Sequence, residues 1–194
     1  STVKMIVTPT LKGGRNDKSR AHMLELLAQR ITGYVEPQYV SDDMLRGQVD
    51  EIEARALYTR HYTPVQEVGF ITNDKWGFTL GYSPDGLVGE DGLIEVKSRR
   101  QRFQAATIIA GVMPDDYLLQ VQTGMLVTGR PWCDFISYCG GMPMVTIRVP
   151  ADDKVQGAII EAAAAFEATL AEQLATYHAN LNCVGQKLIP TERK

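Results

Sequence analysis

The stretch from Gly81 to Lys97, GYSPDGLVGEDGLIEVK, constrains this chain more than any other part of the sequence. Its four acidic residues all precede its first basic residue, Lys97. The closing segment, IEVK, alternates apolar and charged residues, as a strand with one buried face does. Because side chains alternate between the two faces of a strand, Glu95 and Lys97 are predicted to share a face.

Asp85 lies in the tetrapeptide SPDG, a strong turn signal between two strand-like segments. Such a turn predicts a bent β-ribbon that places Asp85 against Glu95, with Lys97 one step farther along. Two carboxylates beside one ammonium group can hold a divalent metal ion and stabilise charge on a phosphate. The alternative is that Asp85 serves only the turn, while Glu95 and Lys97 lie on a solvated strand face, since Asp, Glu and Lys are common residues.

Length and composition indicate one globular domain. The chain has 194 residues, of which 44% are hydrophobic and 22% are charged, which is ordinary for a globular protein. No apolar run approaches the ~20 residues of a membrane span, and the N-terminal segment STVKMIVTPT lacks the features of a signal peptide. The cysteines are odd in number and lack zinc-binding spacing, which favours a reducing compartment. We therefore expect a cytoplasmic protein without a membrane segment.

The charge distribution leaves a nucleic-acid partner open. The formal net charge is −3, whereas nucleic-acid binders are usually basic. Positive charge is nevertheless concentrated in two places, around Lys12 and Arg15 and again from Lys97 to Arg102. The first place, TLKGGRNDK, is equally consistent with a loop that reaches a DNA groove and with a solvated loop.

Hydrophobic spacing and capping residues predict a mixed α/β chain. In the second predicted helix the apolar stripe runs through Leu45, Val49 and Ile52, and Glu51 and Arg55 lie off it as a helix-surface ion pair. Helices are predicted at 19–33, 41–62, 117–127 and 152–181, strands at 65–72, 76–82, 93–98, 132–138 and 144–149, a short strand or turn at 5–7, and a loop at 99–115.

Three separated segments carry a resemblance to a known family. They are GYSPDGLV…DGLIEVKS, the preceding RGQVDEIEAR and the following YLLQVQTGMLVTGR. Together they resemble the lambda exonuclease or YqaJ-type viral recombinase family of the PD-(D/E)xK nuclease superfamily. The resemblance covers residues 5–150 and includes AHMLELLAQRITG, which is similar to the family's first core helix. It implies an α/β restriction-endonuclease-like fold, with a mixed sheet flanked by helices.

The resemblance also implies a division of the single domain, 1–194, and a role for each matching residue. The division is a basic loop region at 1–17, a catalytic core at 18–150, a C-terminal helix at 151–182 and a tail at 183–194. Asp85 matches the metal-bridging aspartate, Glu95 the second metal carboxylate, the Val96 carbonyl a backbone metal ligand, and Lys97 the catalytic lysine.

Further positions match supporting roles in the same family. Gln120 matches a glutamine that supports the site, and Glu51 matches a helix glutamate that holds metal-bound water. Ser83 matches a serine near the scissile or terminal phosphate. Lys12 and Arg15 lie where the family inserts a loop into the DNA groove.

The implied activity is 5′–3′ digestion of linear double-stranded DNA, which leaves 3′ overhangs for recombination by single-strand annealing. It implies Mg²⁺ or Mn²⁺, with two ions, a toroidal homotrimer, a single-strand annealing protein as partner, and a phage or prophage gene acting in the bacterial cytoplasm. The family's R-x-G-x-[IV]-T-[AG]-S segment, which helps to hold a 5′-phosphate, is not found before the first predicted strand. Dependence on a 5′ end is therefore less secure than metal-dependent cleavage.

Three alternatives remain beside this activity. One is a PD-(D/E)xK endonuclease, another is a RecB-type nuclease domain that needs no DNA end, and the third is a nuclease-like fold that only binds DNA. Because every metal and lysine position is retained, we rank the binding-only fold last of these.

Overall fold

The computed structural model describes residues 3–7, 17–37, 39–181 and 188–192. Within these residues a central sheet has the strand order β3 (Gly86–Val88), β4 (Gly92–Ser98), β5 (Trp132–Tyr138) and β6 (Val145–Pro150). Strands β4 and β5 are parallel, whereas both outer strands pair antiparallel. A separate antiparallel pair joins β1 (Ile71–Asn73) to β2 (Leu80–Tyr82). The predicted mixed sheet with flanking helices is thus confirmed.

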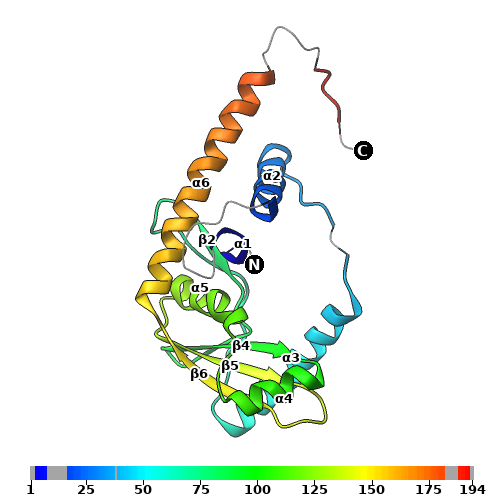
Figure 1. Ribbon diagram of the computed structural model, residues 1–194, viewed down its shortest axis with the longest axis vertical. Coiled ribbons are helices and arrows are strands. Elements are labelled where there is room, and N and C mark those ends of the chain that lie inside the picture. Colours follow the sequence, from blue (N-terminus) through cyan, green and yellow to red (C-terminus); the bar gives the residue numbers. More distant parts are fainter. Residues whose placement is uncertain (1–2, 8–16, 38, 182–187, 193–194) are drawn as a thin grey trace.

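The helices form layers on both sides of the sheet (Figure 1). Helix α3 covers one face, and α5 covers the other and also packs against α6. The short α1 and the longer α2 pack on α6 beyond α5. No helix in the described ranges is both long and apolar enough to span a membrane. The helical segments are α1 (Val3–Ile6), α2 (Asp17–Thr32), α3 (Asp42–His61), α4 (Gln101–Ala110), the 3₁₀ helix η1 (Asp115–Tyr117), α5 (Leu118–Thr128) and α6 (Asp153–Leu181).

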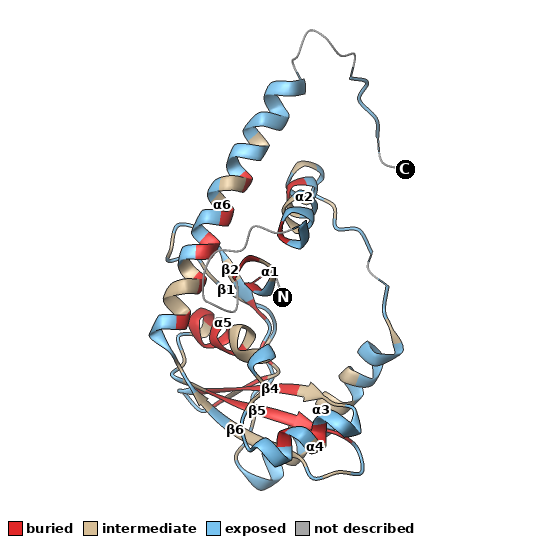
Figure 2. Cartoon of the chain, in the orientation of Figure 1, coloured by how far each residue is buried: buried red, intermediate tan, exposed pale blue. Residues whose placement is uncertain are grey.

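Strand β4 is buried on both faces, and its alternation decides which residues meet which helix (Figure 2). Ile94 and Val96 pack into the cluster beneath α3. Leu93 packs into the cluster beneath α5. Because alternate residues share a face, Glu95 and Lys97 also project toward α5.

Helix α3 buries a different face from the predicted one. Ala54 and Tyr58 are its fully buried residues, and the Tyr58 hydroxyl donates a 2.6 Å hydrogen bond to Asp134 Oδ2 on β5. The face of α3 that carries Tyr58 is therefore buried, because Asp134 on β5 accepts its hydrogen bond. The face that carries more apolar side chains is not. The predicted core stripe is exposed instead, with exposed fractions of 51% at Leu45, 58% at Val49 and 62% at Ile52.

The prediction of a loop over 99–115 is wrong, because α4 occupies most of this segment. The buried residues of α4, Gln104 and Thr107, are polar. The segment therefore lacks the helical spacing of apolar residues by which an amphipathic helix is recognised. Gln104 Nε2 instead donates to the carbonyls of Ser137 at 3.0 Å and Pro143 at 2.7 Å. Gly111 ends the helix with a positive φ of 64°, a conformation that glycine adopts without strain.

The remaining predicted elements differ from the structure mainly at their ends. A strand or turn was expected at 5–7, but residues 5 and 6 belong to α1 instead. Val3 and Ile6 lie one helical turn apart in α1 and are both buried, with α1 packed on α6. The strands predicted at 65–72 and 76–82 are much shorter as β1 and β2, and β3 was not predicted. The four predicted helices and the strands β4, β5 and β6 are confirmed within one or two residues.

Candidate active site

Asp85 and Glu95 meet where β3 begins beside β4. The antiparallel ladder pairs Gly86 with Ile94, so the next step of the same register sets Asp85 opposite Glu95. Asp85 Oδ2 accepts a 2.6 Å hydrogen bond from the backbone N–H of Val96. The turn that the SPDG segment predicts therefore brings the two carboxylates together, as expected.

Three side chains from three elements hold the carboxylate of Glu95, which is only 2% exposed. Gln120 Nε2 on α5 donates to Glu95 Oε1 at 2.5 Å. Lys97 Nζ contacts the same oxygen from two residues farther along β4. The hydroxyl of Tyr82, at the end of β2, donates to Oε2.

Sequence reasoning missed Tyr82. Its local signal is weak, because a tyrosine ending a short strand is commonly a core residue. Burial and the Glu95 carboxylate raise the pKa of Tyr82 well above its ordinary range, so the hydroxyl remains a donor. Its role at Glu95 depends on the packing of β2 against α5, which hydrophobic periodicity does not reveal.

Lys97 is charged in this site although it is largely buried. Burial alone lowers the pKa of Lys97, but the carboxylates of Glu95 and Asp85 outweigh it and raise the pKa above its ordinary value. Its Nζ also lies 5.6 Å from the ring centroid of Tyr117, a distance typical of a cation–π contact. The site thus holds a fixed positive charge beside its carboxylates.

The surroundings of Asp85 disfavour its negative charge. Burial and, after it, the carboxylates of Glu95 and Glu51 raise the pKa of Asp85 from 3.8 to about 7. The hydrogen bond from the Val96 N–H and the charge of Lys97 act in the opposite direction. Excess negative charge of this kind is relieved when a cation binds.

Glu51 and Arg55 form the predicted ion pair on α3, with Arg55 Nη1 3.1 Å from Glu51 Oε1. The pair is more than a surface feature, because Arg55 Nη1 also donates to the Asp85 carbonyl at 2.8 Å. Arg55 therefore fastens the turn before β3 to α3. Glu51 is also close enough to Asp85 for its charge to raise the pKa of that carboxyl.

Ser83 is exposed and lines a cavity of about 650 Å³ together with Tyr82 and Gln120. Phe70 and Arg30 line the same cavity. The structure thus brings Ser83 to the edge of the same group of residues. Lys12 and Arg15 lie outside the described residues.

Comparison with known proteins places this geometry in a family. Residues 9–131 match the YqaJ-like viral recombinase domain. The chain belongs to the YqaJ-like viral recombinase family. The resemblance drawn from the sequence is therefore confirmed.

Two solved structures share both fold and sequence with this family member. The alkaline exonuclease LHK-Exo from Laribacter hongkongensis is 34% identical, with a TM-score of 0.81 over 92% of this chain and 89% of that chain. The complex of LHK-Exo with dAMP gives 34% identity and a TM-score of 0.82, over 92% and 90% of the two chains. The restriction-endonuclease-like PD-(D/E)xK fold is confirmed by these relatives.

A more distant structure supports the fold alone. The phage-related exonuclease from Haemophilus somnus 129PT is 14% identical, with a TM-score of 0.67 over 91% of this chain and 94% of that chain. A search of curated proteins found no match.

The donor set fits a hard divalent cation. Within the described ranges, no three His, Cys, Asp or Glu side chains are grouped so that they alone could hold a metal ion. A metal ion held by Asp85 and Glu95 would therefore need further ligands, which the Val96 carbonyl and water could supply. An all-oxygen set of this kind suits Mg²⁺ or Mn²⁺ rather than Zn²⁺, and the raised pKa of Asp85 marks the place where positive charge is lacking.

Proposed function

We propose that this YqaJ-family chain is a metal-dependent exodeoxyribonuclease that digests the 5′-ended strand of linear duplex DNA and leaves 3′ overhangs. The observation that carries the proposal is the meeting of Asp85, Glu95 and Lys97 beside Gln120, in a chain 34% identical to an alkaline exonuclease. Carboxylates beside an ammonium group suit phosphodiester hydrolysis, since charge develops on phosphate oxygens during the reaction. The family and these relatives together support nuclease chemistry.

Asp85, Glu95 and the Val96 carbonyl would hold Mg²⁺ or Mn²⁺, and two ions are proposed. A bound ion supplies Lewis-acid stabilisation of the phosphate and lowers the pKa of a bound water. Asp85 is suited to this because its Oδ2 already takes one backbone hydrogen bond, from Val96.

Lys97 is proposed to orient the attacking water and to offset charge on the phosphate. Its ammonium group contacts Glu95 Oε1 and remains charged. Gln120 and Tyr82 are proposed as positioning residues, because they hold the Glu95 carboxylate from two sides. Glu51, paired with Arg55, is proposed to hold water at the metal site.

Ser83 and the cavity that it shares with Gln120 are proposed to receive the terminal nucleotide. The cavity volume of about 650 Å³ is within the usual range for a site that binds a small molecule. The loop that carries Lys12 and Arg15 is proposed to contact the duplex, where cationic side chains favour phosphates.

We also propose that the chain works as a homotrimer and acts with a single-strand annealing protein. The exposed apolar stripe of α3, with Leu45, Val49 and Ile52 each more than half exposed, supports self-association, because exposed apolar patches mark interaction sites. The viral recombinase family supports a phage or prophage origin and work in the host cytoplasm. Light scattering after gel filtration tests the trimer, and a monomer at micromolar concentration contradicts it.

Strand-specific digestion tests the central proposal. Linear duplex DNA with a 5′-phosphate is compared with the same DNA as a closed circle, with Mg²⁺ and with chelator. We expect metal-dependent loss of the 5′-ended strand from the linear form alone. Cutting of the closed circle would support an endonuclease instead, and loss of the 3′-ended strand would reverse the proposed polarity.

Lys97→Ala is the matched inactive variant for this assay. We expect cleavage to fall by at least about 10³-fold, because the charge that acts on the phosphate is removed. Circular dichroism serves as the control that the fold is retained. Cleavage at the wild-type rate by the folded variant would remove Lys97 from the active site.

A further inference from the structure

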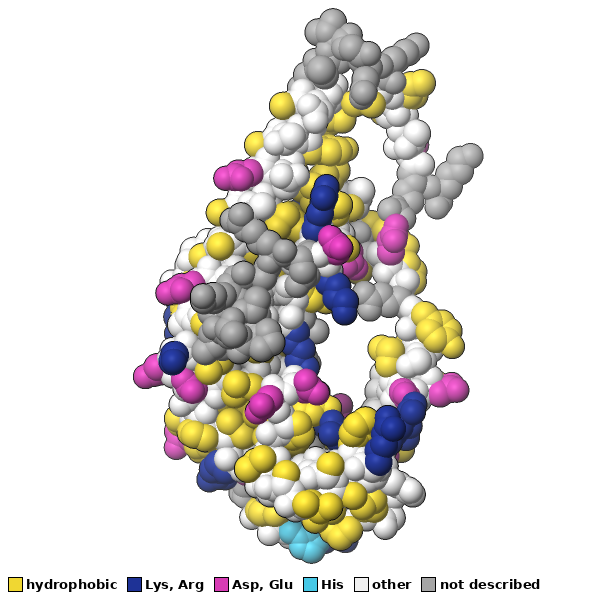
Figure 3. All heavy atoms as spheres, viewed as in Figure 1, with side chains coloured by type: hydrophobic (Ala, Val, Ile, Leu, Met, Phe, Trp, Pro, Cys, Tyr) yellow, Lys and Arg dark blue, Asp and Glu magenta, His cyan; other side chains and the backbone are white. Residues whose placement is uncertain are grey.

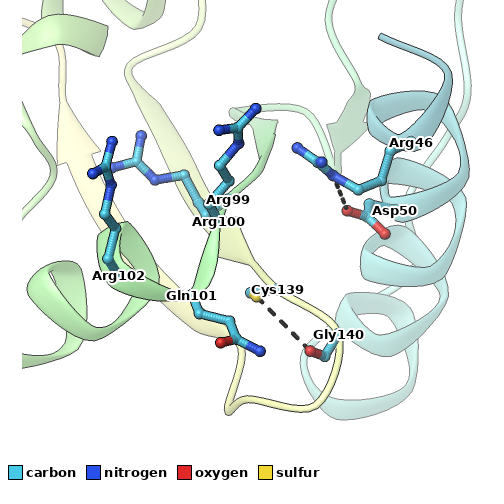
Figure 4. Close-up of a pocket in the computed structure, with 8 residues that line it drawn as sticks. All are labelled: Arg46, Asp50, Arg99, Arg100, Gln101, Arg102, Cys139 and Gly140. Atoms are coloured by element: carbon cyan, nitrogen blue, oxygen red, sulfur yellow. Dashed lines mark hydrogen bonds and ion pairs between the residues drawn. The ribbon is translucent and has the colours of Figure 1, made fainter. Parts of the chain in front are cut away.

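A second basic site lies at the C-terminal end of β4, where β4 gives way to α4 (Figure 4). A cavity of about 810 Å³ opens there. We call it the arginine pocket, and its charged lining consists of Arg46, Asp50, Arg99, Arg100 and Arg102. Figure 4 shows Arg46 pointing from α3 toward the arginines that follow β4. Figure 3 shows that Lys and Arg side chains also gather around the hollow in the face displayed there.

The arginine pocket carries more positive than negative charge. Arg46 and Arg100 each bond to Asp43, at 2.8 Å and 2.9 Å. Arg99 and Arg102 have no carboxylate partner among the described residues, and their guanidinium groups lie over the Phe103 ring at 5.2 Å and 4.5 Å. Two guanidinium groups are thus held by an aromatic ring with no anion to neutralise them.

The arginine pocket also contains an unsatisfied donor and an uncapped helix start. Arg99 Nε is buried and has no hydrogen-bond partner in the described structure. Helix α4, of 10 residues, begins at this pocket, and its N-cap residue Arg100 provides no side-chain hydrogen bond to the helix. The first N–H groups of a helix favour an anion when no cap accepts them. Buried donors without partners are uncommon, so the Arg99 guanidinium keeps hydrogen-bonding capacity that the protein itself does not use.

The arginine pocket is physically joined to the candidate active site. Arg99 lies two residues after Lys97, and both cations contact the same Tyr117 ring, with centroid distances of 5.2 Å and 5.6 Å. Arg99 Nη1 also donates to the Tyr117 hydroxyl. An anion at Arg99 would therefore neighbour a phosphate at Lys97.

We propose that the arginine pocket binds a backbone phosphate of the nucleic-acid strand, next to the phosphate at the active site. The proposal rests on the proposed function only for the identity of that neighbouring phosphate. Guanidinium groups bind phosphate oxygens through paired hydrogen bonds, and contacts to the backbone set the register of a strand without reading its sequence. The pocket thus fixes the strand on a polynucleotide and has no role on a substrate with a single phosphate.

The test is DNA affinity in chelator, where no cleavage occurs. Arg102→Gln and the double variant Arg99→Gln with Arg102→Gln are compared with Arg60→Gln. Arg60 is exposed near the other end of α3, and its replacement removes the same charge. We expect the double variant to bind duplex DNA about 10-fold more weakly, with a salt slope lower by about 1 to 2, because each lost phosphate contact lowers the slope by about 1.

Arg102→Gln alone keeps the test valid if loss of the Arg99–Tyr117 bond impairs folding. We expect this single variant to lower the salt slope by about 1. Slopes equal to that of Arg60→Gln for both variants would overturn the proposal. A pocket that served free phosphate would also leave the slope for DNA unchanged, and that result would overturn it as well.

Hydrolysis of a small chromogenic phosphodiester separates the pocket from the proposed function. With Mn²⁺, wild type and Arg102→Gln should hydrolyse it at equal rates, because the substrate has no second phosphate. A lower rate for Arg102→Gln would overturn the pocket as a separate phosphate site. If wild type hydrolyses neither duplex DNA nor the chromogenic phosphodiester, the proposed function fails. The salt slopes of DNA binding still decide whether the arginine pocket binds DNA.

Discussion

Gln120 donates a 2.5 Å hydrogen bond from α5 to Glu95 Oε1 on β4. Gln122, two residues farther along α5, faces another way and donates to the Pro150 carbonyl at 2.9 Å. Gln122 Oε1 also accepts from the Asp152 backbone N–H before α6. The two glutamines of the QVQ segment therefore serve different parts of the molecule.

Replacement of each glutamine by alanine should separate these roles. We expect Gln120→Ala to lower kcat about 10- to 100-fold, as the loss of a residue that orients a metal ligand typically does, with little change in Tm. Gln122→Ala should lower Tm and leave kcat near wild type, because it fastens the entry to α6. Nuclease assays and thermal melts give both values, and equal loss of kcat in both variants would contradict this division.

The raised pKa of Asp85 predicts that metal-free protein loses stability as pH rises. The folded state holds the Asp85 proton up to a pKa of about 7, whereas the ordinary value is 3.8. The folded state therefore binds more protons than the unfolded state between these values, and stability falls across that window. Across this window the loss amounts to about 4 kcal/mol.

Asp85→Asn removes this pH-dependent loss and still accepts the Val96 hydrogen bond. In chelator we expect it to be more stable than wild type at about pH 8, with the difference shrinking as the pH falls from about 7 toward 3.8, although it should not cleave DNA. Asp91→Asn, on the exposed turn before β4, serves as the control and should follow wild type. Parallel stability curves for wild type and Asp85→Asn in urea unfolding would refute the prediction.

Gly124 allows α5 to pack closely against the ring of Tyr82, whose hydroxyl donates to Glu95. A Cβ at Gly124 would lie 2.5 Å from Cζ of Tyr82, so the ring would have to move together with its hydroxyl. We expect Gly124→Ala to destabilise the fold by about 1–3 kcal/mol, the usual effect of overpacking, and to lower kcat through Glu95. Chemical denaturation and nuclease assays measure the two effects.

Gly157 on α6 is the matched control for that substitution. A Cβ there meets nothing within 4 Å. Gly157→Ala should therefore stabilise the protein by about 0.5–1 kcal/mol, because alanine is the better helix former. Stabilisation by Gly124→Ala as well would show that Tyr82 is free to move.

Tyr58 anchors α3, which carries Glu51, to the sheet. Its hydroxyl bonds to Asp134, which is buried and also receives Arg148 Nε and Nη2 at 2.8 Å and 2.9 Å. We expect Tyr58→Phe to cost about 1–3 kcal/mol in free energy of unfolding, since a buried hydrogen bond to a charged carboxylate is lost. Tyr62→Phe, whose ring stacks on Tyr58 at the exposed end of α3, should change stability by less than about 0.5 kcal/mol.

Local patterns determined the central part of the candidate site. The alternation in IEVK sets Glu95 and Lys97 on one face of β4, and the SPDG turn sets Asp85 opposite Glu95. Both features depend on neighbours within about a dozen residues, where backbone geometry alone decides direction. The family resemblance added Gln120 and Glu51, whose distance along the chain from β4 hides their proximity.

Only the tertiary structure decided which faces of the helices are buried and which groups reach Glu95. Helix α4 buries Gln104 rather than an apolar stripe, so its pattern resembled a loop. Helix α3 buries Tyr58 because Asp134 on the sheet accepts its hydrogen bond, and Tyr82 reaches Glu95 because β2 packs against α5. Such choices depend on hydrogen-bond partners that are far away in the sequence, and hydrophobic periodicity carries no information about them.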